Sequence, residues 1–342
     1  MAKILVTGAN GFVGSQLIRT LIARGDDVTC LVRRTSSLEM IETLDVNLAY
    51  GDVTDRSSVL SAIAGTELVY HVAGCTRAVR AEEYYRVNGY GTGNVLWACA
   101  RQTTPPAVVM VSSLTAAGLA VNGRTGRMRT ELDPPKPVSH YGRSKRLGER
   151  VAEQFAGQVP VTIVRPPIIL GEGDRLGLAV FWAIDRFRIH MSPGIARYRF
   201  SVIHVADLAR LLILVAGRGK RLPAPEDRDA SPAQGYYFAA AEEHPNYADL
   251  GRMIGRALGH RLVYSLYIST PLVWMVSGVF EAAGRARGRP FYLNLDKTRE
   301  VTAGSWVCSP QRAVDELGFA VGAPLTERLR QTAEWYRKHG WL

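Results

Sequence analysis

The sequence predicts an α/β fold in which a doubly wound parallel sheet carries helices on both faces, together with a smaller, discontinuous C-terminal domain. Three observations support this fold class. Short apolar runs alternate with segments of helical periodicity through the first half of the chain. A glycine-rich turn follows the first apolar run directly, and the alternation stops after Gly171.

The alternating first half gives the expected elements in order. Apolar runs of strand length occupy residues 4–7, 28–32, 48–50, 68–72, 108–112 and 161–164. Between them, apolar side chains recur at helical spacing in residues 14–24, 57–64, 88–101 and 144–156. Strands that alternate with helices in this way form a parallel sheet that is covered on both faces.

The second half of the chain is less regular and contains proline-rich loops. Residues 201–208 and 235–240 are expected as strands that return to the first sheet. We therefore expect a first domain of residues 1–170 with returning segments at about 201–215 and 235–241. Residues 171–200 and 242–342 then form the second domain, which is expected to bind the substrate.

Composition limits the class of protein. The 342 residues are 47% hydrophobic and 21% charged, which is enough for a large core. The four cysteines lie far apart without a CxxC pair, so we expect neither a metal site nor a disulfide framework. No basic leader or cleavage site follows the N-terminus, so a cytoplasmic location is expected.

The chain is basic, with a net charge of +11 and a pI of about 9.7. This balance is compatible with nucleic acid, an anionic membrane or an anionic cofactor as the partner. Basic residues are not interleaved with aromatic residues in any run, so we expect no nucleic-acid partner.

Residues 262–283 are rich in large apolar side chains, among them Trp274, Met275 and Phe280. Because Pro271 and Glu281 interrupt the stretch, it is not a clean membrane span. Two alternatives stay open. We favour an apolar helix over the substrate cleft or in a core. The other is weak contact with an anionic membrane surface through the arginines that follow, Arg285, Arg287 and Arg289.

The motif TGANGFVG lies between the first strand and the first helix, where a dinucleotide-binding turn is required. Gly8 would make the tight turn, Gly11 would let a pyrophosphate approach the backbone, and Gly14 would let helix and strand pack closely. The positive end of the helix would then face the phosphates. The sheet is therefore expected to be of the Rossmann type.

The end of the second strand indicates which nicotinamide cofactor is bound. In VTCLVRR, Val32 stands where NAD is usually held by a carboxylate, and Arg33 and Arg34 follow. Two guanidinium groups suit a ribose 2′-phosphate, so NADP(H) is favoured over NAD(H), with surface-exposed arginines as the alternative. Asp52 in GDVTD is placed to accept from the adenine amino group, or it forms a turn.

Two separated motifs carry the catalytic prediction. In YGRSK, Tyr141 and Lys145 lie one helical turn apart, so both side chains share a face, and an ammonium group nearby favours the phenolate. In VVMVSSLTAAG, Ser112 and Ser113 end a strand, where a hydroxyl can hold a reacting oxygen against Tyr141. Tyr141 would exchange a proton with that oxygen while hydride moves to or from the nicotinamide.

In their order, these motifs resemble the extended short-chain dehydrogenase/reductase family, within the NAD-dependent epimerase/dehydratase superfamily. The resemblance covers nearly the whole chain and includes TGANGFVG, GDVTD, HVAG, VSS, YGRSK, RPPIILG and IHVADLA. It implies that Ser113 is the catalytic serine, that Tyr141 is the acid/base, and that Lys145 lowers the pKa of Tyr141 and binds the nicotinamide ribose. It also implies a homodimer formed through helices 88–101 and 144–156.

The resemblance extends to cofactor contacts. Beyond the glycines, the arginines and Asp52, the implied contacts are Asn10, Phe12, Val13, Val53, Ala73, Gly74, Asn88, Ser112, Tyr141, Lys145, Pro166 and Ile168.

Departures from the family pattern indicate the branch. Leu114 and Thr115 replace the Asp-Glu pair of the sugar-nucleotide 4,6-dehydratases, which argues against that reaction. Sugar-nucleotide enzymes of the family tend to carry an asparagine at the position of Ile168 and an arginine at the position of Phe200. The loss of two polar contacts predicts an apolar substrate, with Thr115 and Phe200 as substrate contacts.

RPPIILGEGD is most similar to the 3β-hydroxysteroid dehydrogenase and dihydroflavonol reductase branch. We therefore expect NADP(H)-dependent interconversion of a ketone and a secondary alcohol on a hydrophobic, steroid- or flavonoid-like substrate. Two alternatives stay open. One is a nucleotide-sugar epimerase that uses tightly bound NAD(P), and the other is a non-catalytic, cofactor-binding regulator.

Overall fold

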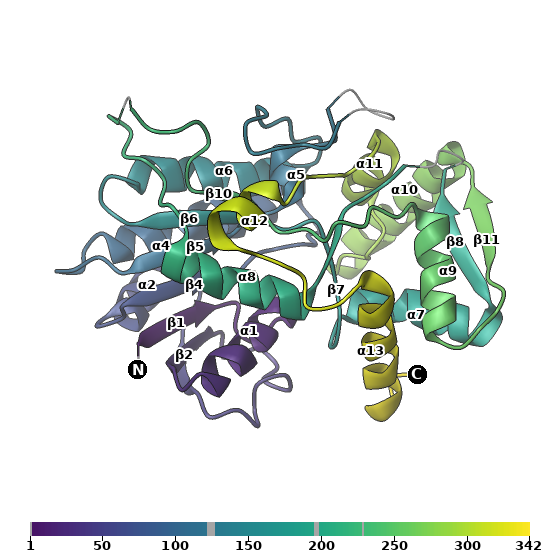
Figure 1. Ribbon diagram of the computed structural model, residues 1–342, viewed down its shortest axis with the longest axis horizontal. Coiled ribbons are helices and arrows are strands. Elements are labelled where there is room, and N and C mark those ends of the chain that lie inside the picture. Colours follow the sequence, from purple (N-terminus) through teal and green to yellow (C-terminus); the bar gives the residue numbers. More distant parts are fainter. Residues whose placement is uncertain (1, 122–126, 195–197, 228) are drawn as a thin grey trace.

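Seven parallel strands form the main sheet of the computed structural model, which describes residues 2–121, 127–194, 198–227 and 229–342 (Figure 1). The spatial order is β10-β6-β5-β4-β1-β2-β3. The strands are β1 (Lys3–Thr7), β2 (Asp27–Val32), β3 (Asn47–Tyr50), β4 (Leu68–His71), β5 (Ala107–Val111), β6 (Val161–Arg165) and β10 (Tyr236–Phe238). Because the strand order reverses between β1 and β4, the carboxyl ends of these two strands border a crevice.

Helices cover both faces of this sheet. One face carries α1 (Phe12–Ala23), α8 (Val205–Arg218) and α12 (Gln311–Leu317). The other carries α2 (Arg56–Ile63), α4 (Thr92–Cys99) and α6 (His140–Phe155). Along β1, Val6 faces the first set and Leu5 the second, so the strand is apolar on both sides. The expected doubly wound fold is confirmed, and the six strands expected in the first half agree with the structure to within one residue at each end.

Three short elements complete the region beside α6. They are α3 (Ala81–Tyr85), the π-helix η1 (Arg86–Gly91) and α5 (Leu114–Ala117). The single helix expected over 88–101 is therefore divided, because its first turns form π-helical hydrogen bonds around Asn88. Such π turns occur frequently at functional sites.

The second region lies at the carboxyl end of the sheet (Figure 1). Its core is formed by α7 (Arg175–Phe187), α9 (Tyr247–Ala257) and α13 (Leu325–Lys338). The strands β8 (Ile189–Pro193) and β11 (Tyr264–Ile268) pair in parallel beside α9, and α10 (Thr270–Arg287) and α11 (Leu295–Ala303) pack together. Helix α12 was expected to belong to the second domain. It packs instead on the first, because Ala313, Leu317 and Phe319 belong to the core beneath α8.

Of the two segments expected to return to the main sheet, only one does so. Strand β10 pairs with β6 in the main sheet, as expected for 235–240. The strand expected over 201–208 is wrong in length and partner: β9 (Val202–His204) pairs with β7 (Ile168–Leu170), and α8 begins at Val205. The helix begins there because the His204 side chain accepts a hydrogen bond from the backbone N–H of Ala206 and caps the first turn.

The apolar stretch 262–283 is not one element. Residues 264–268 form β11, and Pro271 stands in the first turn of α10, where proline is well tolerated. Within the part of the chain that the structure describes, no helix has both the length and the apolar composition needed to cross a bilayer.

Candidate active site

The glycine-rich turn forms a backbone cradle between β1 and α1. Gly8 has a φ of +70°, and a Cβ atom there would lie 2.6 Å from the backbone nitrogen of Ala73. A Cβ atom on Gly14 would lie 2.2 Å from the carbonyl oxygen of Gly8. Both positions therefore require glycine, one for backbone conformation and close approach, the other for packing of helix on strand.

The cradle fits the pyrophosphate of a dinucleotide. Gly11 precedes α1 in an extended conformation and provides no capping side chain, so the first N–H groups of the helix have no side-chain acceptor. These groups and the helix dipole lie at the switch point between β1 and β4, where anions bind in this fold. Phe12 and Val13 open the helix, and Asn10 donates to the carbonyl oxygen of Ser37 in the loop after β2. A nicotinamide dinucleotide held here would accept or donate hydride.

The loop after β2 carries the two arginines expected to select the cofactor. Val32 is buried at the end of the strand, whereas Arg33 and Arg34 are exposed. The Arg34 guanidinium lies 5.0 Å from the centroid of the Tyr50 ring on neighbouring β3. Neither arginine has a carboxylate partner among the described residues.

The turn after β3 is built by Asp52. Its carboxylate accepts from the backbone N–H and the hydroxyl of Thr54, each at 2.8 Å. The structure therefore shows the turn-forming role of Asp52, and contact with adenine stays a prediction. Val53 is buried against Gly91 of η1.

The loop after β4 is held by Asn88. Its side chain accepts from the Cys75 backbone N–H at 2.8 Å, and donates to the Cys75 carbonyl and the Ser144 hydroxyl at 2.9 Å each. This fixes Ala73 and Gly74 beside the glycine cradle. A Cβ atom on Gly74 would lie 3.5 Å from the Lys145 ammonium nitrogen, so this loop is also close to the catalytic helix.

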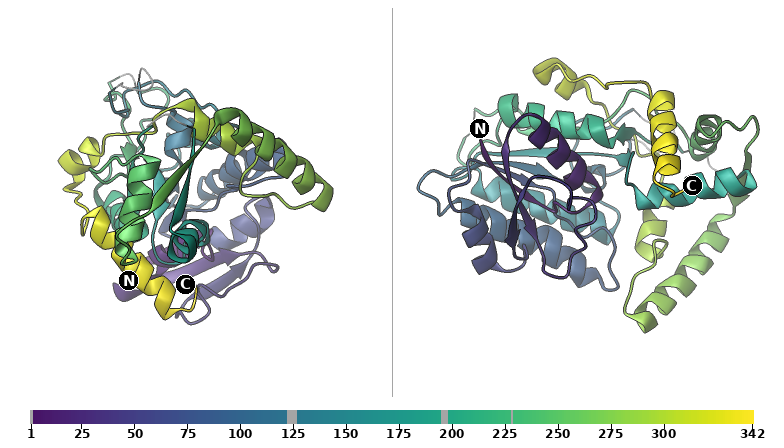
Figure 2. Two further views of the ribbon diagram at one scale, coloured as in Figure 1. Left: turned by 90° about the vertical axis from the view of Figure 1, so that its right-hand side faces the viewer. Right: turned by 90° about the horizontal axis from the view of Figure 1, so that it is seen from below.

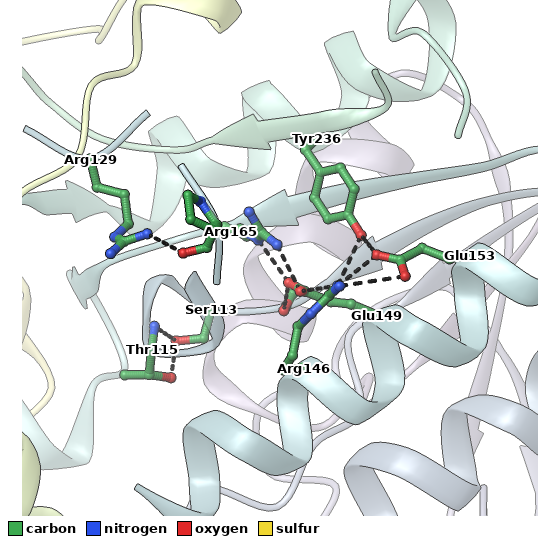
Figure 3. A network of polar contacts seen from close by, with 10 residues as sticks. Ser113, Thr115, Arg129, Arg146, Glu149, Glu153, Arg165 and Tyr236 are labelled. Carbon is green, nitrogen blue, oxygen red and sulfur yellow. Dashed lines mark hydrogen bonds and ion pairs between the residues drawn. The ribbon is translucent and has the colours of Figure 1, made fainter. Parts of the chain in front are cut away.

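Two serines end β5, and their hydroxyl groups have different partners. Ser112 donates to a Glu149 carboxylate oxygen at 2.6 Å, so its side chain is not brought to the crevice. Ser113 caps α5 and accepts from the backbone N–H and the hydroxyl of Thr115, at 3.1 and 2.8 Å (Figure 3). Its own proton is left for an acceptor such as the oxygen of Tyr141 or of a substrate.

Tyr141, Lys145 and Glu149 recur every fourth residue on α6, so they share the helix face that meets the sheet. Lys145 donates to the Val111 carbonyl at 2.7 Å. Glu149 is fully buried. Its carboxylate accepts from Nε and Nη2 of Arg165 at 2.8 and 2.7 Å (Figure 3). The ion pair thus fixes the rotation of the helix that carries Tyr141.

The electrostatics of Tyr141 differ from the expectation. Burial and the Glu300 carboxylate raise its pKa to about 12, while the Ser113 hydroxyl and the Lys297 ammonium act in the opposite direction. Lys145 is not among the main groups that shift this pKa; its ammonium donates to the Val111 carbonyl, and burial lowers the pKa of Lys145 itself to about 8. Its expected lowering of the Tyr141 pKa stays a prediction. The cation that opposes the raised pKa is Lys297.

Lys297 belongs to a group of charged residues on α11 that contacts the start of α6. The Asp296 carboxylate accepts from the backbone N–H groups of His140 and Tyr141, at 2.7 and 3.0 Å. Glu300 accepts from the Ser139 hydroxyl, which caps α6, and pairs with Lys297, both at 2.7 Å. The second region therefore anchors the N-terminus of the catalytic helix, where carboxylates are favourable.

Three further expected contacts lie beyond α6. Pro166 is buried and its carbonyl accepts from the Leu114 N–H, while Ile168 in β7 is 37% exposed. Phe200 is only 3% exposed and its ring packs on Tyr247, with centroids 4.7 Å apart. Protein atoms cover most of the Phe200 side chain in this structure, and its expected substrate contact stays a prediction.

Sequence reasoning missed two parts of the site. The Asp296, Lys297 and Glu300 group has no motif and lies more than 150 residues from Tyr141 in the sequence. Glu149 had a usable signal, since it continues the four-residue spacing of Tyr141 and Lys145 on a helix that packs against strands.

Comparison with known proteins agrees with this geometry. Residues 4–228 match the model of the NAD dependent epimerase/dehydratase family. The sterol demethylase protein B of Methylococcus capsulatus is 37% identical over 221 residues, which are 64% of this chain and 66% of that protein. The ceramide reductase of Caulobacter vibrioides is 27% identical over 340 residues, 99% of this chain and 96% of that protein.

The fold is shared with solved structures. A UDP-glucose 4-epimerase from Thermotoga maritima superposes with a TM-score of 0.75 at 19% identity, over 98% of this chain and 99% of that one. The matched family model covers the glycine cradle, Ser113, Tyr141 and Lys145. The chain belongs to the NAD dependent epimerase/dehydratase family, as its sequence predicted, and is an enzyme that uses a nicotinamide dinucleotide.

Proposed function

We propose that this enzyme interconverts a ketone and a secondary alcohol on a hydrophobic, steroid- or flavonoid-like substrate, with NADP(H) as the hydride carrier. The observation that carries the proposal is the meeting of Ser113 and Tyr141 at the carboxyl edge of the sheet, next to the glycine cradle and Lys145. The names of two relatives, a sterol demethylase protein and a ceramide reductase, support an apolar substrate.

The hydrogen bonds of Ser113 and Lys145 and the pKa of Tyr141 suggest the proposed roles. Because Ser113 already accepts from Thr115, its proton can be donated to the substrate oxygen. Tyr141, un-ionised at neutral pH with a pKa of about 12, can give its proton to the alkoxide that forms as hydride arrives. Lys145 lies between Val111 and Gly74, where it can donate to the cofactor ribose.

The proposal is tested by the absorbance of reduced nicotinamide. Steroid, flavonoid and aliphatic ketones and UDP-sugars are each mixed with enzyme and either NADPH or NADH. We expect an apolar ketone to consume NADPH, with kcat/KM for NADH lower by roughly a hundredfold, because two exposed guanidinium groups can hold the 2′-phosphate. Replacing both Arg33 and Arg34 by Ala should remove most of this difference.

Other outcomes assign other functions. If no ketone consumes cofactor and a sugar nucleotide is converted to its epimer with cofactor recycled, the enzyme is an epimerase. If NADPH binds but nothing is turned over, the chain is a cofactor-binding regulator. A preference for NADH that Arg33→Ala and Arg34→Ala leave unchanged would contradict the cofactor assignment alone.

The ion pair on α11 gives a prediction about pH dependence. The Glu300 carboxylate raises the pKa of Tyr141 and the Lys297 ammonium lowers it. Glu300→Gln should therefore move the Tyr141 limb of the pH profile of kcat to lower pH, and Lys297→Met should move it to higher pH. The profiles are measured with the ketone that the absorbance screen shows to be the best substrate, and with the corresponding alcohol.

Conservative variants separate charge from structure. Lys297→Arg keeps the positive charge and should keep the wild-type profile, and the double variant Lys297→Met/Glu300→Gln should return toward it. Shifts in the same direction for both single variants would contradict the electrostatic origin, since Gln can still accept from Ser139.

A further inference from the structure

Helix α10 projects from the edge of the molecule (Figure 2). Its buried residues are Val273, Ser277 and Gly284, which lie on one side, and α10 packs against α11. With about 3.6 residues per turn, the opposite side carries Leu272, Met275, Val279, Ala282 and Ala286. A helix at the surface of a globular protein normally has the reverse arrangement.

The exposure of this face is large. Leu272, Met275 and Val279 are 43%, 62% and 63% exposed. In β11, which leads into α10, exposed large side chains continue the apolar character, namely Leu262 before the strand and Tyr264, Leu266 and Tyr267 within it. We call Leu272, Met275 and Val279, with Ala282 and Ala286 on the same side of the helix, the α10 surface. This face is therefore not covered by a core, as one expectation required, and a position over the substrate cleft stays a prediction.

The charges around the α10 surface have one predominant sign. Residues 262–280 contain no Asp, Glu, Lys or Arg. Arg261 precedes this segment, and the exposed Arg285, Arg287 and Arg289 follow it. The acidic residue between them, Glu281, is paired with Arg285 and accepts from the backbone N–H of Leu295. An uncharged apolar surface is thus bordered by an excess of arginine.

We propose that the α10 surface binds peripherally to an anionic lipid bilayer. The apolar side chains would enter the boundary between headgroups and acyl chains, and the arginines at the end of α10 would contact lipid phosphates. A benefit that rests on the proposed function is access to apolar ketones dissolved in the bilayer.

The test is cosedimentation of the full chain with lipid vesicles, without cofactor or substrate, so its result is independent of the proposed reaction. We expect binding to vesicles that contain phosphatidylglycerol and much weaker binding to phosphatidylcholine alone. Met275→Glu/Val279→Glu should lower the bound fraction roughly tenfold or more. Arg287→Gln/Arg289→Gln should weaken binding to the anionic vesicles and reduce its salt dependence.

Leu132→Glu is the matched control, because Leu132 is 63% exposed but lies outside the α10 surface; it should leave vesicle binding unchanged. The proposal is overturned if the chain binds neither kind of vesicle, or if Met275→Glu/Val279→Glu binds as the wild type does. A lower molar mass of that variant in light scattering, without vesicle binding by the wild type, would assign the surface to a second copy of the chain and also overturn it.

Discussion

Replacing Tyr141 by Phe should lower kcat by about 10²–10⁴-fold, the range that a positioned acid or base contributes. The variant removes only a hydroxyl, and the ring keeps its place beside the ring of Tyr84. The cofactor cradle of Gly8, Gly11 and Gly14 is untouched, so NADPH should bind as in the wild type. Initial rates and NADPH fluorescence titration measure the two effects separately.

Tyr84→Phe is the control for this substitution. Tyr84 is a buried neighbour whose ring centroid lies 6.0 Å from that of Tyr141, and its hydroxyl bonds to Asn294 rather than to Ser113. It should keep most of the turnover. Wild-type rates in Tyr141→Phe would show that another group transfers the proton, while loss of NADPH binding would show that the substitution disturbs the fold.

The parts of the site predicted from sequence are those whose geometry is local. Gly8 needs a positive φ, and Gly14 lies against the carbonyl oxygen of Gly8 six residues earlier, so both of these requirements are local. Tyr141 and Lys145 are one helical turn apart, so their shared face follows from spacing alone. The parallel sheet follows from alternation of apolar runs and helices, which is also a short-range pattern.

The charges around Tyr141 could not be predicted in the same way. Asp296, Lys297 and Glu300 reach α6 only because α11 folds back on it. Spacing within YGRSK indicates that Lys145 is near Tyr141, but not that its ammonium bonds to Val111. The sign of the resulting pKa shift depends on these long-range contacts and on burial.

The apolar stretch after residue 261 shows a different limit. Its composition predicts an apolar element, but the direction of its faces depends on what packs against it. Small or polar residues, Ser277 and Gly284, occupy much of the side that faces α11, and Met275 and Val279 are left outside. Hydropathy alone would bury Met275 and Val279 and expose the small and polar residues.

The second large effect is expected at Glu149, and it concerns stability. The carboxylate is fully buried and bonded to Arg165, Arg146 and Ser112 (Figure 3). Although burial alone would raise the pKa of Glu149, the arginines hold it below its ordinary value, so the pair is ionised at neutral pH. Glu149→Gln leaves the buried Arg165 without a counter-charge and should lower the free energy of unfolding by about 3–5 kcal/mol. Urea denaturation measures the change.

Glu39→Gln is the matched control, because Glu39 and Arg175 form an ion pair that is 56% and 65% exposed. This substitution should lower the free energy of unfolding by no more than about 1 kcal/mol. Because the pKa of Glu149 is lower in the folded chain, its contribution is present above the ordinary glutamate pKa of about 4.3 and is lost as the pH falls through the folded value. The difference between wild type and Glu149→Gln should therefore shrink in acid. A difference that is independent of pH would show that Glu149 stabilises the fold by packing and hydrogen bonding, and not by its charge.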